Sequence, residues 1–143
     1  MISALPADLA SSCKIGKPTP FMLMNGTANP LIPWQGGKAG LVTFKDNVLS
    51  AEETLKPFAQ AAQCGSDRSK QDMPDRDPAD GSRVVVERGN GCKALIELVR
   101  VEGGGHTLPG RPSLSDRGVP VGARNNDVST PRVLWDFVRR AVR

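Results

Sequence analysis

The stretch Val101-Glu102-Gly103-Gly104-Gly105-His106-Thr107-Leu108-Pro109-Gly110 joins the end of an apolar run to the only histidine among the 143 residues. Its three consecutive glycines allow a sharp backbone turn, since they carry no Cβ atom. The pattern predicts a strand that ends and presents a histidine. An imidazole titrates near pH ~6.5, so His106 suits general acid–base chemistry. The alternative is a surface-loop histidine whose glycines only make a turn.

A second stretch, from Phe21 to Gly37, repeats this arrangement upstream. The apolar run Phe21–Met24 enters a loop of glycine, asparagine and proline, and these residue types exclude regular structure as far as Gly40. Two strand-to-loop units in this order match the last two catalytic positions of an α/β-hydrolase. In that fold the triad follows the chain order Ser, then Asp or Glu, then His.

The two loops also resemble those of a known family. Asn25–Gly37 reads NGTANPLIPWQGG and resembles the HGTADPLVPYEGG loop of the polyhydroxybutyrate depolymerase and feruloyl esterase group of secreted serine esterases. Gly103–Gly110 reads GGGHTLPG and is similar to the GGGHTWPG loop of that group. Three other short segments also resemble the family, namely Pro6–Leu9, Leu49–Thr54 and Trp135–Phe137. The resemblance covers essentially the whole chain but matches only the C-terminal half of the family.

This resemblance implies an α/β fold. Residues 1–143 would form a single partial domain, the C-terminal portion of an α/β-hydrolase sheet with about three strands and two main helices. The charged segment 65–81 is predicted to be a mobile excursion, and residues 107–127 a lid-like loop. Because the complete sheet has more strands, Phe21–Met24 would keep an open edge, through which two copies can associate.

The resemblance also assigns roles to single residues. His106 would be the general base of a Ser-His-Asp mechanism, Asn29 occupies the position of the acid, and Trp34 would contact the substrate. The family uses no cofactor, and we expect none. The chain departs from the family in having no G-x-S-x-G elbow, Asn25 for a histidine and Leu108 for a tryptophan. Asn29 carries no charge, and the same exchange in a serine protease lowers the rate about 10⁴-fold.

The position of Asn29 leads to a geometric expectation. The loops that follow parallel strands emerge at the same edge of a sheet, so Asn29 and His106 should approach within about 3 to 5 Å. Asp46 and Asp127 are other carboxylates that could serve as the acid. Neither lies in the strand-end loop where the acid belongs.

Composition narrows the range of partners. The net charge is +4, and the basic residues are scattered except for a group at the C-terminus, where they complement the dipole of a predicted helix. No nucleic-acid-binding motif accompanies them, so we expect no nucleic acid partner. No apolar run approaches the ~20 residues that span a bilayer, so we expect no membrane partner. Met1–Leu9 has no signal-peptide pattern and leaves the localisation unknown, whereas the family is typically secreted or periplasmic.

The three cysteines, Cys13, Cys64 and Cys92, lack C-x-x-C spacing, and a single histidine accompanies them. We therefore expect no metal site. An odd number leaves one cysteine without a partner inside the chain, and three reduced thiols are one alternative. The family resemblance instead implies a disulfide between Cys64 and Cys92, with Cys13 free or paired to another segment.

Local patterns predict the remaining elements. A capping box at Ser50–Glu53 starts a helix over about 51–63. Strands are expected at 84–86 and 95–101, with a hairpin turn at 89–91. Thr130 and Pro131 read as the N-cap and first position of a last helix with one apolar stripe, formed by Leu134, Phe137, Val138 and Ala141.

Two functional interpretations follow. The first is the C-terminal half of a serine carboxylic-ester hydrolase, which would act on an ester substrate only when an N-terminal half completes it. Alone, the chain lacks the nucleophile and the oxyanion donors and should be inactive. The alternative is a non-catalytic remnant or interaction protein that retains the fold segment.

Overall fold

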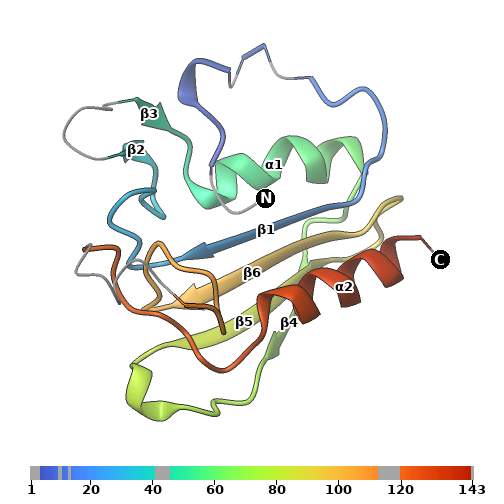
Figure 1. The fold of residues 1–143 in the computed structure, drawn as a ribbon. Helices are drawn as coiled ribbons and strands as arrows, with labels where there is room; N and C mark the ends of the chain where they lie inside the picture. Colours follow the sequence, from blue (N-terminus) through green and yellow to red (C-terminus); the bar gives the residue numbers. More distant parts are fainter. Residues whose placement is uncertain (1–3, 10, 13, 41–45, 113–119, 143) are drawn as a thin grey trace.

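A four-stranded mixed sheet forms the centre of the computed structural model, which describes residues 4–9, 11–12, 14–40, 46–112 and 120–142 (Figure 1). The strand order is β1-β6-β5-β4. Strand β1 (Phe21–Gly26) pairs in parallel with β6 (Ile96–Glu102), and β5 (Arg83–Gly89) pairs antiparallel with both β6 and β4 (Arg68–Asp72). The expected α/β class is therefore observed.

Two helices cover opposite faces of the sheet and make three layers (Figure 1). Helix α1 (Ala51–Ala61) packs on one face, where its Leu55 meets the side chains of Leu23 and Leu98. Helix α2 (Thr130–Ala141) packs on the other face of the sheet, where Phe137 joins a second apolar cluster. That cluster includes Met22, Met24, Val84, Val86, Val99 and Val101. Alternate residues of β1 and β6 thus enter two cores, as the two-residue period of a strand dictates.

Local sequence signals placed several of these elements correctly. The predicted capping box is present, because the Ser50 hydroxyl accepts the Glu53 N–H and the Glu53 carboxylate accepts the Ser50 N–H. The predicted hairpin joins β5 to β6. A disulfide links Cys64 to Cys92, as expected, and ties the end of α1 to this hairpin. Cys13 lies outside the described residues.

The charged segment 65–81, predicted to be a mobile excursion, includes regular structure that the sequence did not indicate. It contains β4 and the short 3₁₀ helix η2 (Pro78–Asp80). Arg68 forms ion pairs with Glu52 and with Glu87, so its charge is not simply solvated. β4 escaped prediction because an edge strand with one solvated face carries polar residues, here RSKQD, and shows no apolar alternation. The main sheet has four strands instead of about three.

Two short strands and a second 3₁₀ helix complete the described elements. β2 (Gly37–Lys38), in the loop expected to be irregular as far as Gly40, pairs with β3 (Asn47–Val48). The 3₁₀ helix η1 (Ala7–Leu9) lies near the N-terminus. Each of these elements has only two or three residues, which is too short for a periodic signal.

Helix α2 begins one residue earlier than expected. Its N-cap is Ser129, and the Thr130 hydroxyl instead donates to the Pro109 carbonyl at 2.9 Å. Phe137 is buried, but Leu134 and Val138 of the expected core stripe are 38% and 47% exposed. Among the described residues, no helix is long and apolar enough to cross a membrane.

Candidate functional site

The loops that follow β1 and β6 lie side by side, because the two strands are parallel and in register from Phe21↔Ile96 to Gly26↔Val101. Backbone hydrogen bonds continue the pairing beyond the strands, from Thr27 N–H to the Val101 carbonyl and from Ala28 N–H to the Gly104 carbonyl. A Cβ atom on Gly26 would lie 2.1 Å from the Gly104 carbonyl oxygen, so only glycine permits this approach. The two loops are thereby locked together.

Asn29 and His106 meet across these loops. The Asn29 Nδ2 atom lies 3.2 Å from the His106 Nδ1 atom, which confirms the expected approach. The Asn29 side chain is buried, and its Oδ1 atom accepts the N–H groups of Leu31 and Ile32 at 3.0 and 2.9 Å. Its Nδ2 atom also donates to the Asn25 Oδ1 atom at 2.9 Å. Asn29 therefore fixes its own loop and contacts the imidazole with the same amide.

Asn25 is a member of this cluster that sequence reasoning did not assign. Its Oδ1 atom accepts both the Gly26 N–H and the Asn29 amide, while its buried Nδ2 atom has no hydrogen-bond partner among the described residues. The only signal in the sequence was that Asn25 and Asn29 depart from the family at two positions of one loop. The structure brings these two departures into direct contact.

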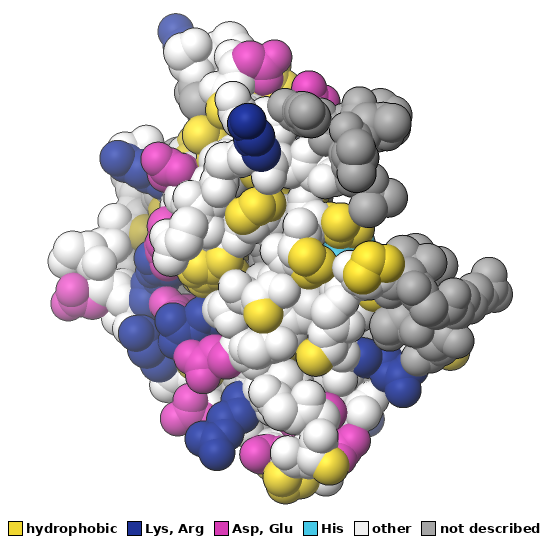
Figure 2. Space-filling view, turned by 90° about the vertical axis from the view of Figure 1, so that its left-hand side faces the viewer, with side chains coloured by type: hydrophobic (Ala, Val, Ile, Leu, Met, Phe, Trp, Pro, Cys, Tyr) yellow, Lys and Arg dark blue, Asp and Glu magenta, His cyan; other side chains and the backbone are white. Residues whose placement is uncertain are grey.

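A cavity of about 100 Å³ adjoins the cluster and opens at the end of the sheet toward which β1 and β6 run. Its lining includes the polar residues Asn25, Asn29, His106 and Thr107 and the apolar residues Met24, Val101 and Leu108. Figure 2 looks onto this end of the molecule and shows a small area of histidine surface between hydrophobic side chains. Burial lowers the pKa of His106 below its usual value, so the neutral imidazole is favoured.

The segment 120–127 also supports the histidine loop. The His106 N–H donates to the Val121 carbonyl, and the Gly105 N–H donates to the Ala123 carbonyl at 2.8 Å. The Thr107 hydroxyl donates to the same Ala123 carbonyl at 3.0 Å. The described part of the predicted lid, 107–112 and 120–127, contains no helix or strand. Its observed contacts hold the backbone of His106 in place, and a role as a lid stays a prediction.

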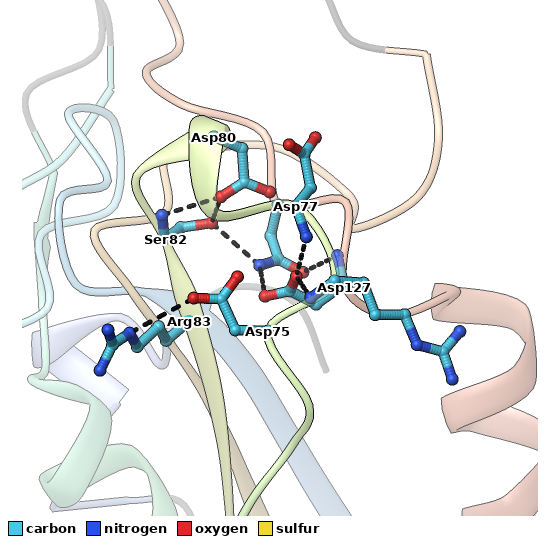
Figure 3. Close-up of polar contacts among 8 residues, drawn as sticks. Asp75, Asp77, Asp80, Ser82, Arg83 and Asp127 are labelled. Carbon is cyan, nitrogen blue, oxygen red and sulfur yellow. Dashed lines mark hydrogen bonds and ion pairs between the residues drawn. The ribbon is translucent and has the colours of Figure 1, made fainter.

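Asp127 anchors that supporting segment (Figure 3). It accepts the backbone N–H groups of Arg76 and Asp77 at 2.7 and 3.1 Å, and the Asn125 Nδ2 at 2.8 Å. Burial alone would raise the pKa of Asp127, but the hydrogen bonds from Asn125, Arg76 and Asp77 outweigh it and hold the pKa below its usual value. These contacts make Asp127 a structural carboxylate. Asp46 is an exposed loop residue whose carbonyl accepts the Ala39 N–H.

Trp34 lies away from the cavity at His106. It packs against the apolar cluster beneath α1, and its carbonyl accepts the Ala51 N–H at the start of that helix. Trp34 is absent from the residues that line the cavity, so its predicted contact with substrate finds no support in this geometry. Leu108 lines the cavity in the family's tryptophan position and is 40% exposed.

The chemistry available at this site is limited by what lines it. No serine or cysteine is among the described lining residues, and the one hydroxyl in the lining, that of Thr107, donates to the Ala123 carbonyl. Among the described residues, no group of three or more His, Cys, Asp or Glu side chains is arranged to hold a metal ion. The arrangement can orient an imidazole and offer it to a small molecule in the cavity.

Comparisons with known proteins identified no relative. No family model, no curated protein and no solved structure matches this chain.

Proposed function

We propose that this chain is the C-terminal portion of a serine carboxylic-ester hydrolase of the polyhydroxybutyrate depolymerase and feruloyl esterase type, with His106 in the general-base position. The observation that carries the proposal is the 3.2 Å contact between Asn29 Nδ2 and His106 Nδ1 at the ends of two parallel strands. In a triad the acid contacts this same ring nitrogen of the base. The two loops that resemble the family are thus the two that meet.

An N-terminal half would have to supply the missing catalytic groups, namely the nucleophilic serine and the oxyanion donors. The β1 edge is where its strands would pair, since β1 is the outermost strand of the sheet yet is largely buried and apolar. Strands that are apolar on both faces are typical of the interior of a parallel sheet. The ester substrate would bind only to the completed protein.

Esterase assays test the proposal directly. The isolated chain should not hydrolyse p-nitrophenyl butyrate above a His106→Ala control. The chain should gain turnover when it is co-expressed with a family N-terminal half that carries the G-x-S-x-G elbow. That turnover should be lost in His106→Ala and should increase in Asn29→Asp, since a carboxylate orients and stabilises the imidazolium. Turnover by the isolated chain, or a complemented Asn29→Asp protein that has none, would contradict the proposal.

The second candidate function is a non-catalytic interaction protein. The uncharged Asn29 favours it, because an amide cannot stabilise an imidazolium as a carboxylate does. The outer side of α2 favours it as well, since Leu134, Trp135, Val138 and Val142 are 38%, 64%, 47% and 79% exposed. Exposed apolar side chains that lie together on one side of a helix are typical of a surface that a partner covers.

A further inference from the structure

The orientation of the Asn29 amide follows from its neighbours. Its Oδ1 atom faces two backbone donors, the N–H groups of Leu31 and Ile32. Turning the amide by half a revolution would point its Nδ2 hydrogens at these two donors and its oxygen at the Asn25 oxygen. Three of the four contacts of the side chain, those with Leu31, Ile32 and Asn25, would then become repulsive. The Nδ2 atom must therefore face both Asn25 Oδ1 and His106 Nδ1.

This orientation determines the tautomer of His106. The two hydrogens of Asn29 Nδ2 serve its two neighbours, so the His106 Nδ1 atom acts as the acceptor and carries no hydrogen. A neutral imidazole then has its proton on Nε2. Protonation of Nδ1 would set two donors against each other, and burial of the ring also favours the neutral form. The ring nitrogen left for a ligand is thus a hydrogen-bond donor.

The cavity fits an uncharged ligand with an acceptor oxygen. No Asp, Glu, Lys or Arg is among its described lining residues, so a charged ligand would lose hydration without gaining an ion pair. The lining includes the apolar residues Met24, Val101 and Leu108, which suit a short aliphatic chain. A volume of about 100 Å³ is well below the ~300 Å³ at which drug-sized ligand sites begin. The ligand must therefore be small.

We propose that Asn29 holds neutral His106 as the Nε2–H tautomer, and that the cavity beside it binds the carbonyl oxygen of a short, uncharged acyl compound such as an ester or amide. The Nε2–H donates to the carbonyl oxygen, and the aliphatic chain lies against the apolar lining. This inference deepens the proposed function, because it names the acyl group as the part held beside His106. The Nε2–H tautomer cannot accept a serine proton on Nε2, which is why Asn29→Asp should increase the turnover of the completed protein. Binding requires no nucleophile, so it can be measured on the isolated chain.

NMR on protein labelled with ¹⁵N in its single histidine tests both parts. At a pH where titration shows a neutral ring, the wild-type spectrum should be that of the Nε2–H tautomer. Butyramide should shift the His106 ring resonances saturably, whereas butylamine, a cation of similar size without a carbonyl, should not. A wild-type Nδ1–H tautomer would overturn the proposal. An absence of saturable shifts, or equal shifts with both probes, would do so as well.

The variant Asn29→Asp makes the test specific. Its carboxylate can only accept, so the proton of the neutral ring should move to Nδ1 and leave Nε2 without a hydrogen. Butyramide binding, measured at a pH above the His106 pKa of this variant, should then weaken about tenfold, the loss expected for one hydrogen bond. Asn47→Asp, the same change at an exposed residue of β3, should bind as the wild type does. Unchanged binding by Asn29→Asp would overturn the proposal, and the wild-type measurements decide it if that variant does not fold.

Failure of this inference is distinguishable from failure of the proposed function. The esterase assay on the completed protein reports the nucleophile and the general base, whereas butyramide binding reports the donor and the cavity alone. A chain that binds butyramide but gains no turnover on completion supports the inference and contradicts the ester hydrolase. The opposite result supports the hydrolase and overturns the inference.

Discussion

At the scale of single residues, the candidate site depends on the uncharged amide of Asn29. Asn29 accepts two backbone hydrogens, as a carboxylate would, but it donates where a carboxylate would accept. Asn25 complements it, because its Oδ1 atom receives one of the amide hydrogens. In the part of the chain that the structure describes, the buried Asn25 Nδ2 atom has no hydrogen-bond partner. A carboxylate at position 29 could accept a hydrogen bond from the Asn25 Nδ2 atom if the Asn25 amide rotated.

We therefore predict that Asn29→Asp raises the pKa of His106. The carboxylate would lie beside Nδ1, where it favours the imidazolium, whereas the present amide and the burial of the ring favour the neutral form. An NMR titration of the single histidine measures the pKa in both proteins, and Asn47→Asp controls for the added negative charge. A pKa that is equal in wild type and Asn29→Asp would mean that the two side chains do not interact in solution.

At the scale of elements, the loop that presents His106 is held by a segment without regular structure. Val121 and Ala123 accept hydrogen bonds from the histidine loop, and Asn125 accepts the Gly110 N–H. Asp127 fixes this segment to the loop after β4 through Arg76 and Asp77 (Figure 3). The carboxylate thus supports His106 through the backbone, without contacting it.

Asp127→Ala should lower the free energy of unfolding by about 2 to 4 kcal/mol, since it leaves two backbone N–H groups and the Asn125 amide without their acceptor. Urea unfolding measures the change. Asp136→Ala is the matched control, because Asp136 pairs with Arg139 on the surface of α2 and should cost less than about 1 kcal/mol. Equal losses in the two variants would contradict the assignment of Asp127 as an anchor.

The same carboxylate makes a pH-dependent contribution with a definite sign. The pKa of Asp127 is lower in the folded chain than its ordinary value of 3.8. Its contribution to stability is therefore fully present above that ordinary value and is lost as the pH falls through the lower folded value. The wild type should accordingly lose its advantage in unfolding free energy over Asp127→Ala as the pH falls from 3.8 through the folded pKa of Asp127.

Sequence patterns predicted the elements whose signals are local. The apolar runs of β1 and β6 and the capping box of α1 each depend on neighbours within a few residues, and all three were found. β4 was missed because its polar residues gain their partners from β5 and from α1, far away in the sequence. The approach of Asn29 to His106 was predictable from two strand-to-loop units, whereas the bridging Asn25 depends on side-chain geometry that no spacing encodes.

At the scale of the whole molecule, α2 is attached firmly but covered on one side only. Phe137 packs into the core, and Arg140 pairs with the buried Glu97 of β6. The opposite side of the helix exposes Trp135 and Val138 to solvent. On the same face of the sheet, Met22 and Met24 belong to β1, the outermost strand. An apolar helix side and an open strand edge are both features through which proteins associate.

We predict that the isolated chain self-associates reversibly through the exposed apolar side of α2, which carries Trp135 and Val138. In sedimentation equilibrium the weight-average mass should rise above the 15.2 kDa of one chain as the concentration increases. Trp135→Glu combined with Val138→Lys should reduce the association, because both charges would have to be desolvated in the contact. Arg132→Glu, an exposed change on the same helix, should leave it intact. A mass that stays at one chain over the whole concentration range would rule out self-association, and an unchanged association in the double variant would assign it to the β1 edge alone.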